Sequence, residues 1–190
     1  MSTELYEQFP HIENEKIIIR KMIDSDLESL LEISSNDNVY KHCPLFLYKK
    51  SKSFLSTAIN NLGGRDFEKK KYIIAGIYLP DNPEKLIGTA EMFDYDKNVN
   101  MITIGYKINE SFWNQGIATN AVAAMIEYLF NQIRINRIQA FVMPDNVYSK
   151  KVLLKNGFMR EGLVRQGNVW TGKGVVDLMI FSILRSDCVK

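Results

Sequence analysis

The chain has 190 residues, of which 46% are hydrophobic, enough to form the core of one domain at the usual size of roughly 150 residues. Its 24 lysines and arginines nearly balance its 22 acidic residues, for a formal net charge of +2. This composition excludes a disordered or fibrous chain and lacks the strongly basic surface of a nucleic-acid-binding protein. We therefore expect a single domain over residues 1–190 that does not bind nucleic acid directly.

The cysteines and histidines indicate a reduced protein without a metal. Cys43 and Cys188 lie far apart, and with only His11 and His42 beside them they offer neither zinc-ligand spacing nor a disulfide framework. The longest apolar run, residues 121–126, is too short to span a membrane, and the N-terminal segment has no apolar stretch of the kind that a signal peptide needs. The sequence thus predicts a cytoplasmic protein with no membrane association.

The first third of the chain predicts a strand followed by two helices. Three isoleucines at 17–19, flanked by charged residues, are typical of a short buried strand. Asp24-Ser25-Asp26 supplies a helix cap before leucines at helical spacing, and a weaker helical pattern covers residues 51–62 before Gly63-Gly64. We interpret the irregular segment between these helices, which contains Cys43-Pro44, as ordinary packing, with a substrate-side wall as the alternative.

The rest of the chain alternates strands and helices. Strands are predicted at 72–79, 86–93 and 101–108, joined by short turns as an antiparallel meander, and a long, nearly buried helix ends at about residue 133. A strand at 137–143 and a helix at 147–155 follow, and two last strands at 158–166 and 175–184 flank a polar, glycine-rich loop at 167–174. The fold class predicted is α+β with a mixed, largely antiparallel central sheet.

Two segments carry the chemistry. In the first, residues 113–119, a strand leads into a helix, whose free N–H groups and dipole attract an anion, and Gly116 and Ala118 leave room for a pyrophosphate. An ordinary strand-to-helix turn is the alternative, and the absence of G-x-G-x-x-G or a Walker loop disfavours dinucleotides and ATP. In the second, Asn146 and Ser149 lie one turn apart at a helix start, which is also what a plain helix cap looks like.

Together, the two segments resemble the GNAT superfamily of acyl-CoA-dependent N-acyltransferases. Gly116-Ile117-Ala118 matches the end of its Q/R-x-x-G-x-G/A loop, and Trp113 in place of the leading Gln or Arg is similar to the Rim-type branch, which includes RimJ and RimL. The stretches 13–20 and 146–158, followed by Glu161-Gly162, resemble further motifs of that branch. The resemblance covers residues 13–184 and implies a sheet splayed between its middle strands, with acetyl-CoA in the opening.

The resemblance also implies site residues. The splayed strand offers a backbone N–H to the thioester carbonyl, and the helix start holds the pyrophosphate. Ser149 is the candidate proton donor, because Leu153 stands where many GNAT enzymes have a tyrosine. Glu91 is the candidate base, with Glu161 as a second option and a structural ion partner as the alternative for either. The residues expected to bind the cofactor are Tyr106, Lys107, Ile108, Asn114, Gln115, Gly116, Ile117, Ala118, Thr119, Asn146 and Ser149.

The acceptor is expected to be an N-terminal α-amine of a protein, as in ribosomal-protein acetylation, or of a peptide. An α-amine has a pKa of about 7.7–8 against about 10.4 for lysine, so it needs only a weak base. The alternatives are a polyamine or aminoglycoside acetyltransferase and an acyl-CoA-binding module without turnover. A polyamine enzyme should line its cleft with carboxylates, whereas residues 36–65 contain Asp37 as their one acid. The oligomeric state stays open, with a homodimer among the options.

Overall fold

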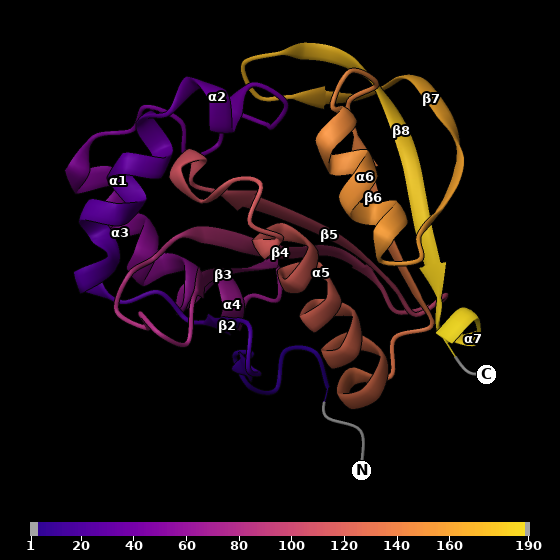
Figure 1. Ribbon diagram of the computed structural model, residues 1–190, viewed down its shortest axis with the longest axis horizontal. Helices are drawn as coiled ribbons and strands as arrows, with labels where there is room; N and C mark the ends of the chain where they lie inside the picture. The colour runs from indigo at the N-terminus through magenta and orange to yellow at the C-terminus, as the bar shows by residue number, and fades with distance from the viewer. Residues whose placement is uncertain (1–3, 189–190) are drawn as a thin grey trace.

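The computed structural model describes residues 4–188, and Figure 1 shows a sheet that runs through the molecule with helices on both sides. The strands are β1 (Ile12–Glu13), β2 (Ile18–Arg20), β3 (Tyr72–Tyr78), β4 (Gly88–Asp96), β5 (Met101–Ile108), β6 (Arg137–Val142), β7 (Met159–Trp170) and β8 (Gly174–Leu184). Their spatial order is β1-β2-β3-β4-β5-β6-β8-β7. β5 and β6 run parallel, and the other neighbours in the described sheet are antiparallel. The expected fold class is confirmed.

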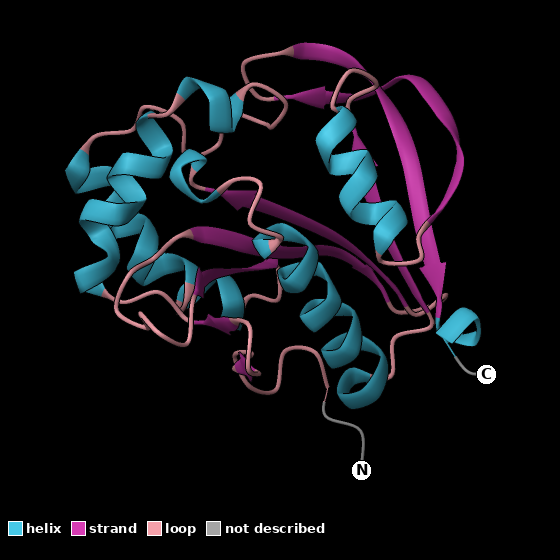
Figure 2. Ribbon diagram, in the orientation of Figure 1, coloured by secondary structure: helices cyan, strands magenta, loops and turns pink. Residues whose placement is uncertain are grey.

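The helices, cyan in Figure 2, are α1 (Leu27–Ser35), α2 (Asp37–Tyr40), α3 (Lys52–Leu62), α4 (Arg65–Glu68), α5 (Ile117–Glu127), α6 (Val147–Lys155) and α7 (Arg185–Cys188). The 3-10 turns η1 (Asp24–Asp26) and η2 (Glu110–Phe112) precede α1 and α5, and a π-helical segment, η3 (Tyr128–Ile133), continues α5. No helix between residues 4 and 188 has both the length and the apolar character needed to cross a bilayer.

Alternation along the strands divides their side chains between two cores. Around β2, Ile17 and Ile19 pack into the core that α5 and α6 share, whereas Ile18 packs into the core beneath α1 and α3. In β3, Ile73 faces the first core and Ile74 the second. The sheet is therefore covered on one face by α5 and α6 and on the other by α1 and α3.

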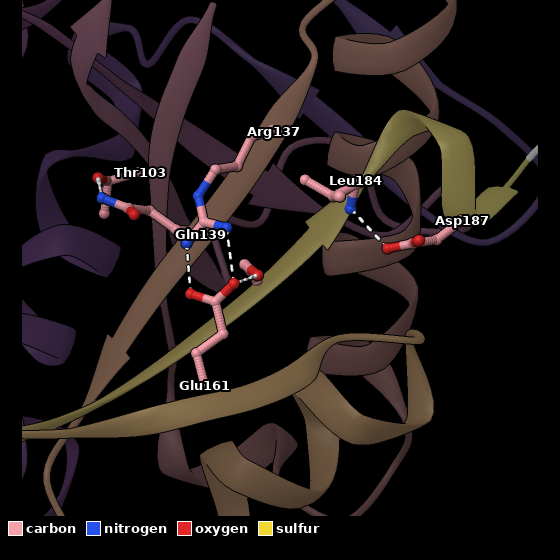
Figure 3. A network of polar contacts seen from close by, with 7 residues as sticks. Thr103, Arg137, Gln139, Glu161, Leu184 and Asp187 are labelled. Atoms are coloured by element: carbon pink, nitrogen blue, oxygen red, sulfur yellow. Dashed lines mark hydrogen bonds and ion pairs between the residues drawn. The ribbon is translucent and has the colours of Figure 1, made fainter. Parts of the chain in front are cut away.

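The seam between β5 and β6, meaning the line along which these two strands lie side by side, is closed at one end and open at the other. Residues 101–103 pair with 137–139, and there the ladder stops, although both strands continue beyond it. The last register pair is also joined through its side chains, since Gln139 Nε2 donates to Thr103 Oγ1 at 3.1 Å (Figure 3). Beyond this pair lies the sheet opening that the resemblance implies.

The C-terminal hairpin differs from the prediction. The sequence predicts a loop over 167–174, but β7 continues through Trp170, so the prediction is wrong for the first half of that segment. A bulge is the reason: Gln166 has a φ of +49°, and its N–H donates to Asp177 Oδ1 at 2.7 Å. The ladder with β8 then resumes at Asn168. Gly167 thus lies within the bulged strand, whereas Gly172 and Gly174, with left-handed φ angles of +74° and +71°, mark the hairpin turn.

Candidate active site

A tight turn carries the chain from β5 into α5. Asn114 and Gly116 have left-handed φ angles of +61° and +77°, a conformation that glycine adopts freely and asparagine tolerates better than most residues. The indole N–H of Trp113 donates to the carbonyl of Ile108 at 2.8 Å. Trp113 thereby ties the turn to the last residue of β5, which gives a physical role to the residue at which this chain departs from the GNAT loop pattern.

The start of α5 presents unpaired backbone donors to an open space. The first N–H of the helix to bond back is that of Asn120, which donates to the Gly116 carbonyl at 3.0 Å. The N–H groups of Ile117, Ala118 and Thr119 have no such acceptor, and no side chain within the described residues caps this helix. A Cβ built on Gly116 would meet no heavy atom within 4 Å. An anionic group can therefore approach these donors, as the pyrophosphate of acetyl-CoA requires.

The register of β4 and β5 shows which backbone groups face the opening. Asn109 N–H donates to the Ile87 carbonyl at 2.8 Å, so this pair is hydrogen-bonded, and the bonding alternates along the antiparallel ladder. Lys107 accordingly directs its backbone groups toward β4. Tyr106 and Ile108 direct theirs away from β4, and the carbonyl of Ile108 is taken by Trp113. The backbone of Tyr106 is thus available inside the opening.

A pair of hydroxyl groups spans the opening on the α5 and α6 side. The Tyr106 hydroxyl from β5 and the Ser149 Oγ from α6 lie 2.8 Å apart. Ser149 is held at the helix start because its N–H donates to Asn146 Oδ1 at 3.1 Å. Burial raises the pKa of Tyr106 to about 12, although the bond with Ser149 lowers it. Sequence reasoning placed the Tyr106 backbone at the site and missed its side chain, whose partner lies 43 positions away.

The other face of the sheet carries an ion pair at the open end of the seam. Glu91 and Lys107 form a hydrogen-bonded salt bridge, with side chains only 19% and 11% exposed. Burial disfavours the Lys107 ammonium, but the opposing attraction of Glu91, Cys43 and Tyr40 prevails, and the pKa of Lys107 is raised. The Lys107 ammonium also lies 5.7 Å from the ring centroid of Tyr40. Strand alternation could have revealed the pair, because Glu91 is opposite Gly105 and Lys107 is two residues further along.

Residues 41–48 form a wall across this side of the opening. At one end, α2 is fastened to η2, since the side chains of Asn36 and Asn38 both donate to Glu110 at 2.8 Å. At the other end, Leu45 N–H donates to the Thr171 carbonyl at 3.0 Å, in the turn between β7 and β8. Leu47 is also buried in the core beneath α1 and α3, so the segment packs as expected and lies beside the opening as well.

Glu161 lies at the closed end of the seam (Figure 3). It accepts two bonds from Arg137, at 2.7 and 2.5 Å, and one from Ser182 Oγ at 2.6 Å. These hydrogen bonds, Arg137 first, lower the pKa of Glu161 to about 2. Arg137 pairs with Met101 in the seam, away from the opening. This geometry favours the structural ion partner over the base for Glu161.

The structure gathers the remaining candidate residues around the opening, with Gln115 at its margin. Gln115 is exposed, and its Nε2 donates back to the Ser111 carbonyl at 3.3 Å. Asn146 is an N-cap whose side chain is engaged by Ser149 N–H. Within residues 4–188, no group of three or more histidine, cysteine or acidic side chains is arranged to hold a metal ion.

Comparison with known proteins places these features in a family. The model of the family described as "Acetyltransferase (GNAT) domain" matches residues 16–159 of this chain. YoaA, an uncharacterized N-acetyltransferase of Bacillus subtilis (strain 168), is 30% identical over 177 residues, which are 93% of this chain and 98% of that protein. The ribosomal-protein-serine acetyltransferase of Escherichia coli (strain K12) is 29% identical over 92 residues, 48% of this chain and 51% of that one.

A solved structure of the same fold is RimJ of Mycobacterium smegmatis, in complex with CoA-disulfide. It superposes with a TM-score of 0.78 at 20% identity, covering 92% of this chain and 84% of that one. At this identity the likeness shows the fold alone. The opening between β5 and β6 is a feature of that fold.

Proposed function

This chain is a member of the GNAT acetyltransferase family and an acetyl-CoA-dependent N-acetyltransferase, and we propose that its acceptor is the N-terminal α-amine of a protein, with ribosomal proteins as the leading class. Acetyl-CoA supplies the activated acetyl group in this family. The proposal treats residues 1–190 as one catalytic domain and places the reaction in the cytoplasm. One protomer holds every group that the proposal needs, so it does not require a homodimer.

The proposed cofactor site follows the opening. The free N–H groups of residues 116–119 hold the pyrophosphate, with Asn114 and Gln115 shaping the turn, and the backbone of Tyr106 offers its N–H to the thioester carbonyl. Ile108 continues the free strand edge with its N–H, whereas the backbone of Lys107 faces β4, so Lys107 contributes to this site only through its side chain. Asn146 and Ser149, at the start of α6, face the same opening from the β6 side.

The acceptor class is proposed on one observation: two carboxylates on the acceptor side, Glu91 and Asp37, are each paired with a lysine. Glu91 is bound by Lys107, and Asp37 lies 2.8 Å from the Lys49 ammonium. A polyamine carries several positive charges and needs unpaired carboxylates to replace its hydration. An α-amine brings a single charge and already has an appreciable neutral fraction at pH 7, since its ordinary pKa is about 7.7–8. The site therefore suits an α-amine better than a polycation.

Two side chains are proposed for proton transfer. Ser149 donates toward the departing sulfur, and Glu91 receives the proton of the amine through water from the other face of the sheet. Lys107 keeps the charge of Glu91 compensated while it does so. The Escherichia coli relative, which aligns with 48% of this chain, is named a ribosomal-protein-serine acetyltransferase. That name supports a ribosomal-protein acceptor.

The test is acetyl-CoA-dependent thiol release with matched acceptors. One peptide is offered with a free N-terminus and again with that amine blocked, each with an internal lysine, beside spermidine and an aminoglycoside. We expect turnover with the free N-terminus alone. Equal turnover of the blocked peptide would move the acceptor to lysine, and preference for spermidine or the aminoglycoside would replace the proposal with a small-molecule acceptor.

A further inference from the structure

The hydrogen bond between Tyr106 and Ser149 has no part in the function proposed so far. Tyr106 is partly buried against the core beneath α5, and its hydroxyl reaches Ser149 Oγ at 2.8 Å across the opening. It is the one side chain within residues 4–188 that hydrogen-bonds the Ser149 hydroxyl. Two rigid elements, β5 and the capped start of α6, therefore hold this pair in place.

A serine hydroxyl by itself is a poor proton donor. Loss of its proton leaves an alkoxide, which is far more basic than a thiolate, whose ordinary pKa is about 8.5. A neighbouring donor that supplies a second proton as the first one leaves reduces this difficulty, because the alkoxide never forms. The Tyr106 hydroxyl is placed to do so, and since burial raises its pKa to about 12 it remains protonated at neutral pH.

We propose that Tyr106 is a positioning residue for proton delivery to the departing thiolate, and that it acts through Ser149. Its hydroxyl donates to Ser149 Oγ, which leaves the Ser149 hydrogen free to point into the opening. This inference rests on the proposed function, because it assigns a second residue to the same transfer. It also gives Tyr106 two separate tasks, one for its backbone N–H and one for its side chain.

The atoms and protons of the step balance. The acceptor nitrogen forms a bond to the acetyl carbon, and the bond from that carbon to sulfur breaks with its electron pair going to sulfur. Ser149 gives its hydroxyl proton to the sulfur and takes the Tyr106 proton in its place. The proton released by nitrogen passes through water to Glu91, which returns it to solvent, and solvent water restores the proton of Tyr106. One proton leaves nitrogen and one arrives at sulfur, without an oxidant or reductant.

The first experiment compares Tyr106→Phe with Tyr95→Phe in the wild-type background. Both changes remove one hydroxyl from the same sheet, and the Tyr95 hydroxyl bonds Asn100, away from the opening. We expect Tyr106→Phe to lower kcat about tenfold, as loss of part of a general-acid contribution would, with an unchanged KM for acetyl-CoA. Tyr95→Phe should change neither. An unchanged kcat in Tyr106→Phe, or a change in KM alone, would overturn the inference.

The second experiment tests whether the two hydroxyls act as one unit. Ser149→Ala should also lose at least tenfold in kcat, and the double variant should be no slower than Ser149→Ala, because Tyr106 has nothing to act through once Ser149 is gone. Losses that multiply would show two independent roles. In mixtures of H₂O and D₂O, kcat of the wild type should follow a curve that reports two protons in flight, and Tyr106→Phe a straight line. A straight line in both would contradict the relay.

The two proposals fail in different ways. If the wild type turns over an N-terminal peptide while Tyr106→Phe is equally fast, the relay is wrong and the acceptor proposal stands. If the wild type turns over none of the offered amines, the acceptor proposal is wrong, and the relay falls with it.

Discussion

Two carboxylate ion pairs lie at opposite ends of the seam between β5 and β6, and their surroundings differ. At the closed end, Glu161 binds Arg137 in a pair whose side chains are 37% and 22% exposed. At the open end, the side chains of Glu91 and Lys107 are 19% and 11% exposed. Glu161, at a bulge in β7, links three neighbouring strands, β6, β8 and β7, through Arg137 and Ser182. Glu91 stands on β4, next to the part of β5 that has no partner in β6.

The comparison shows that residue type does not separate a structural carboxylate from one placed for chemistry. In sequence terms both glutamates are candidate bases. Their position along the seam distinguishes them, since only beyond Thr103 and Gln139 do the strands part. The four predictions below test this contrast, beginning with the largest effect.

Breaking the buried pair should cost the most stability. Lys107→Met leaves the Glu91 carboxylate without its partner, and removal of one member of a buried pair typically costs about 3 kcal/mol or more. The double variant Glu91→Gln/Lys107→Met removes both charges and should recover most of that loss. Urea unfolding at pH 7 gives both values. A loss below about 1 kcal/mol for Lys107→Met would mean that the pair behaves like a surface contact.

A charge at the start of α5 should abolish tight cofactor binding. Gly116→Asp and Gly116→Asn have nearly the same shape, and both residues tolerate the left-handed φ of +77° better than most. Acetyl-CoA at a hundredfold excess over its Kd should stabilise the wild type by about 2.7 kcal/mol, on the order of 5 to 10 °C in Tm.

The aspartate variant should lose this Tm shift, with a Kd about a hundredfold weaker, whereas the asparagine variant keeps most of it. If asparagine and aspartate weaken binding equally, the space in front of Gly116 matters and its charge does not. If neither affects the shift, the pyrophosphate does not lie there.

Breaking the pair between Glu161 and Arg137 should lower the free energy of unfolding by less than breaking the pair between Glu91 and Lys107. It should leave kcat unchanged. The folded pKa of Glu161, about 2, lies below the ordinary value of about 4.3, so its contribution is present above pH 4.3 and is lost as the pH falls toward 2. Because Glu161 is partly exposed, we expect Glu161→Gln to lose no more than about 1 kcal/mol at pH 7.

Denaturant unfolding from pH 7 to pH 2 checks the sign, because the gap between wild type and variant should close at the acid end. Glu15→Gln, on a side chain that is 83% exposed, is the surface control. A tenfold loss of kcat in Glu161→Gln would place Glu161 in the chemistry and remove the contrast between the two ends.

Loosening the turn before α5 should have the smallest effect. Trp113→Phe keeps an aromatic ring and removes the indole N–H that bonds the Ile108 carbonyl. A lost hydrogen bond of about 0.7 kcal/mol corresponds to roughly a threefold rise in the KM for acetyl-CoA. Steady-state kinetics measures this, with Tyr95→Phe, whose hydroxyl bonds Asn100 away from the opening, as control. Equal effects of the two changes would show that the Trp113 bond does not hold the cofactor loop.

Most of the fold was predictable because its signals are local. The meander of β3, β4 and β5 follows from alternation and short turns, and the cofactor loop follows from the glycine and small residues that precede α5. Short elements such as α2 and α4 were missed because four residues cannot form a stable helix alone. The side chain of Asn36 caps α2 by accepting from the N–H groups of Asn38 and Val39, a local signal that marks where a helix begins but not that it lasts only four residues.

The candidate site was predictable in part. The spacing of the motifs identified Gly116, Asn146 and Ser149 as candidates. The partners of Ser149 and Glu91, which are Tyr106 and Lys107, are distant from them in the sequence. Tyr106 and Lys107, adjacent in β5, point to opposite faces by strand alternation, but strand register and helix packing decide which partner each side chain meets. No local pattern reports on a register that tertiary packing selects.

The wall over the acceptor side is built from segments far apart in the chain. Lys173 Nζ donates to the Lys41 carbonyl across 132 positions, and Leu45 bonds Thr171 nearby. Such long-range contacts form late in folding, because the entropy of closing a large loop opposes them. Leu47 anchors the wall in the core beneath α1 and α3, whereas α5 belongs to the other core. Local opening of the wall would therefore disturb the core beneath α1 and α3 and leave α5 in place.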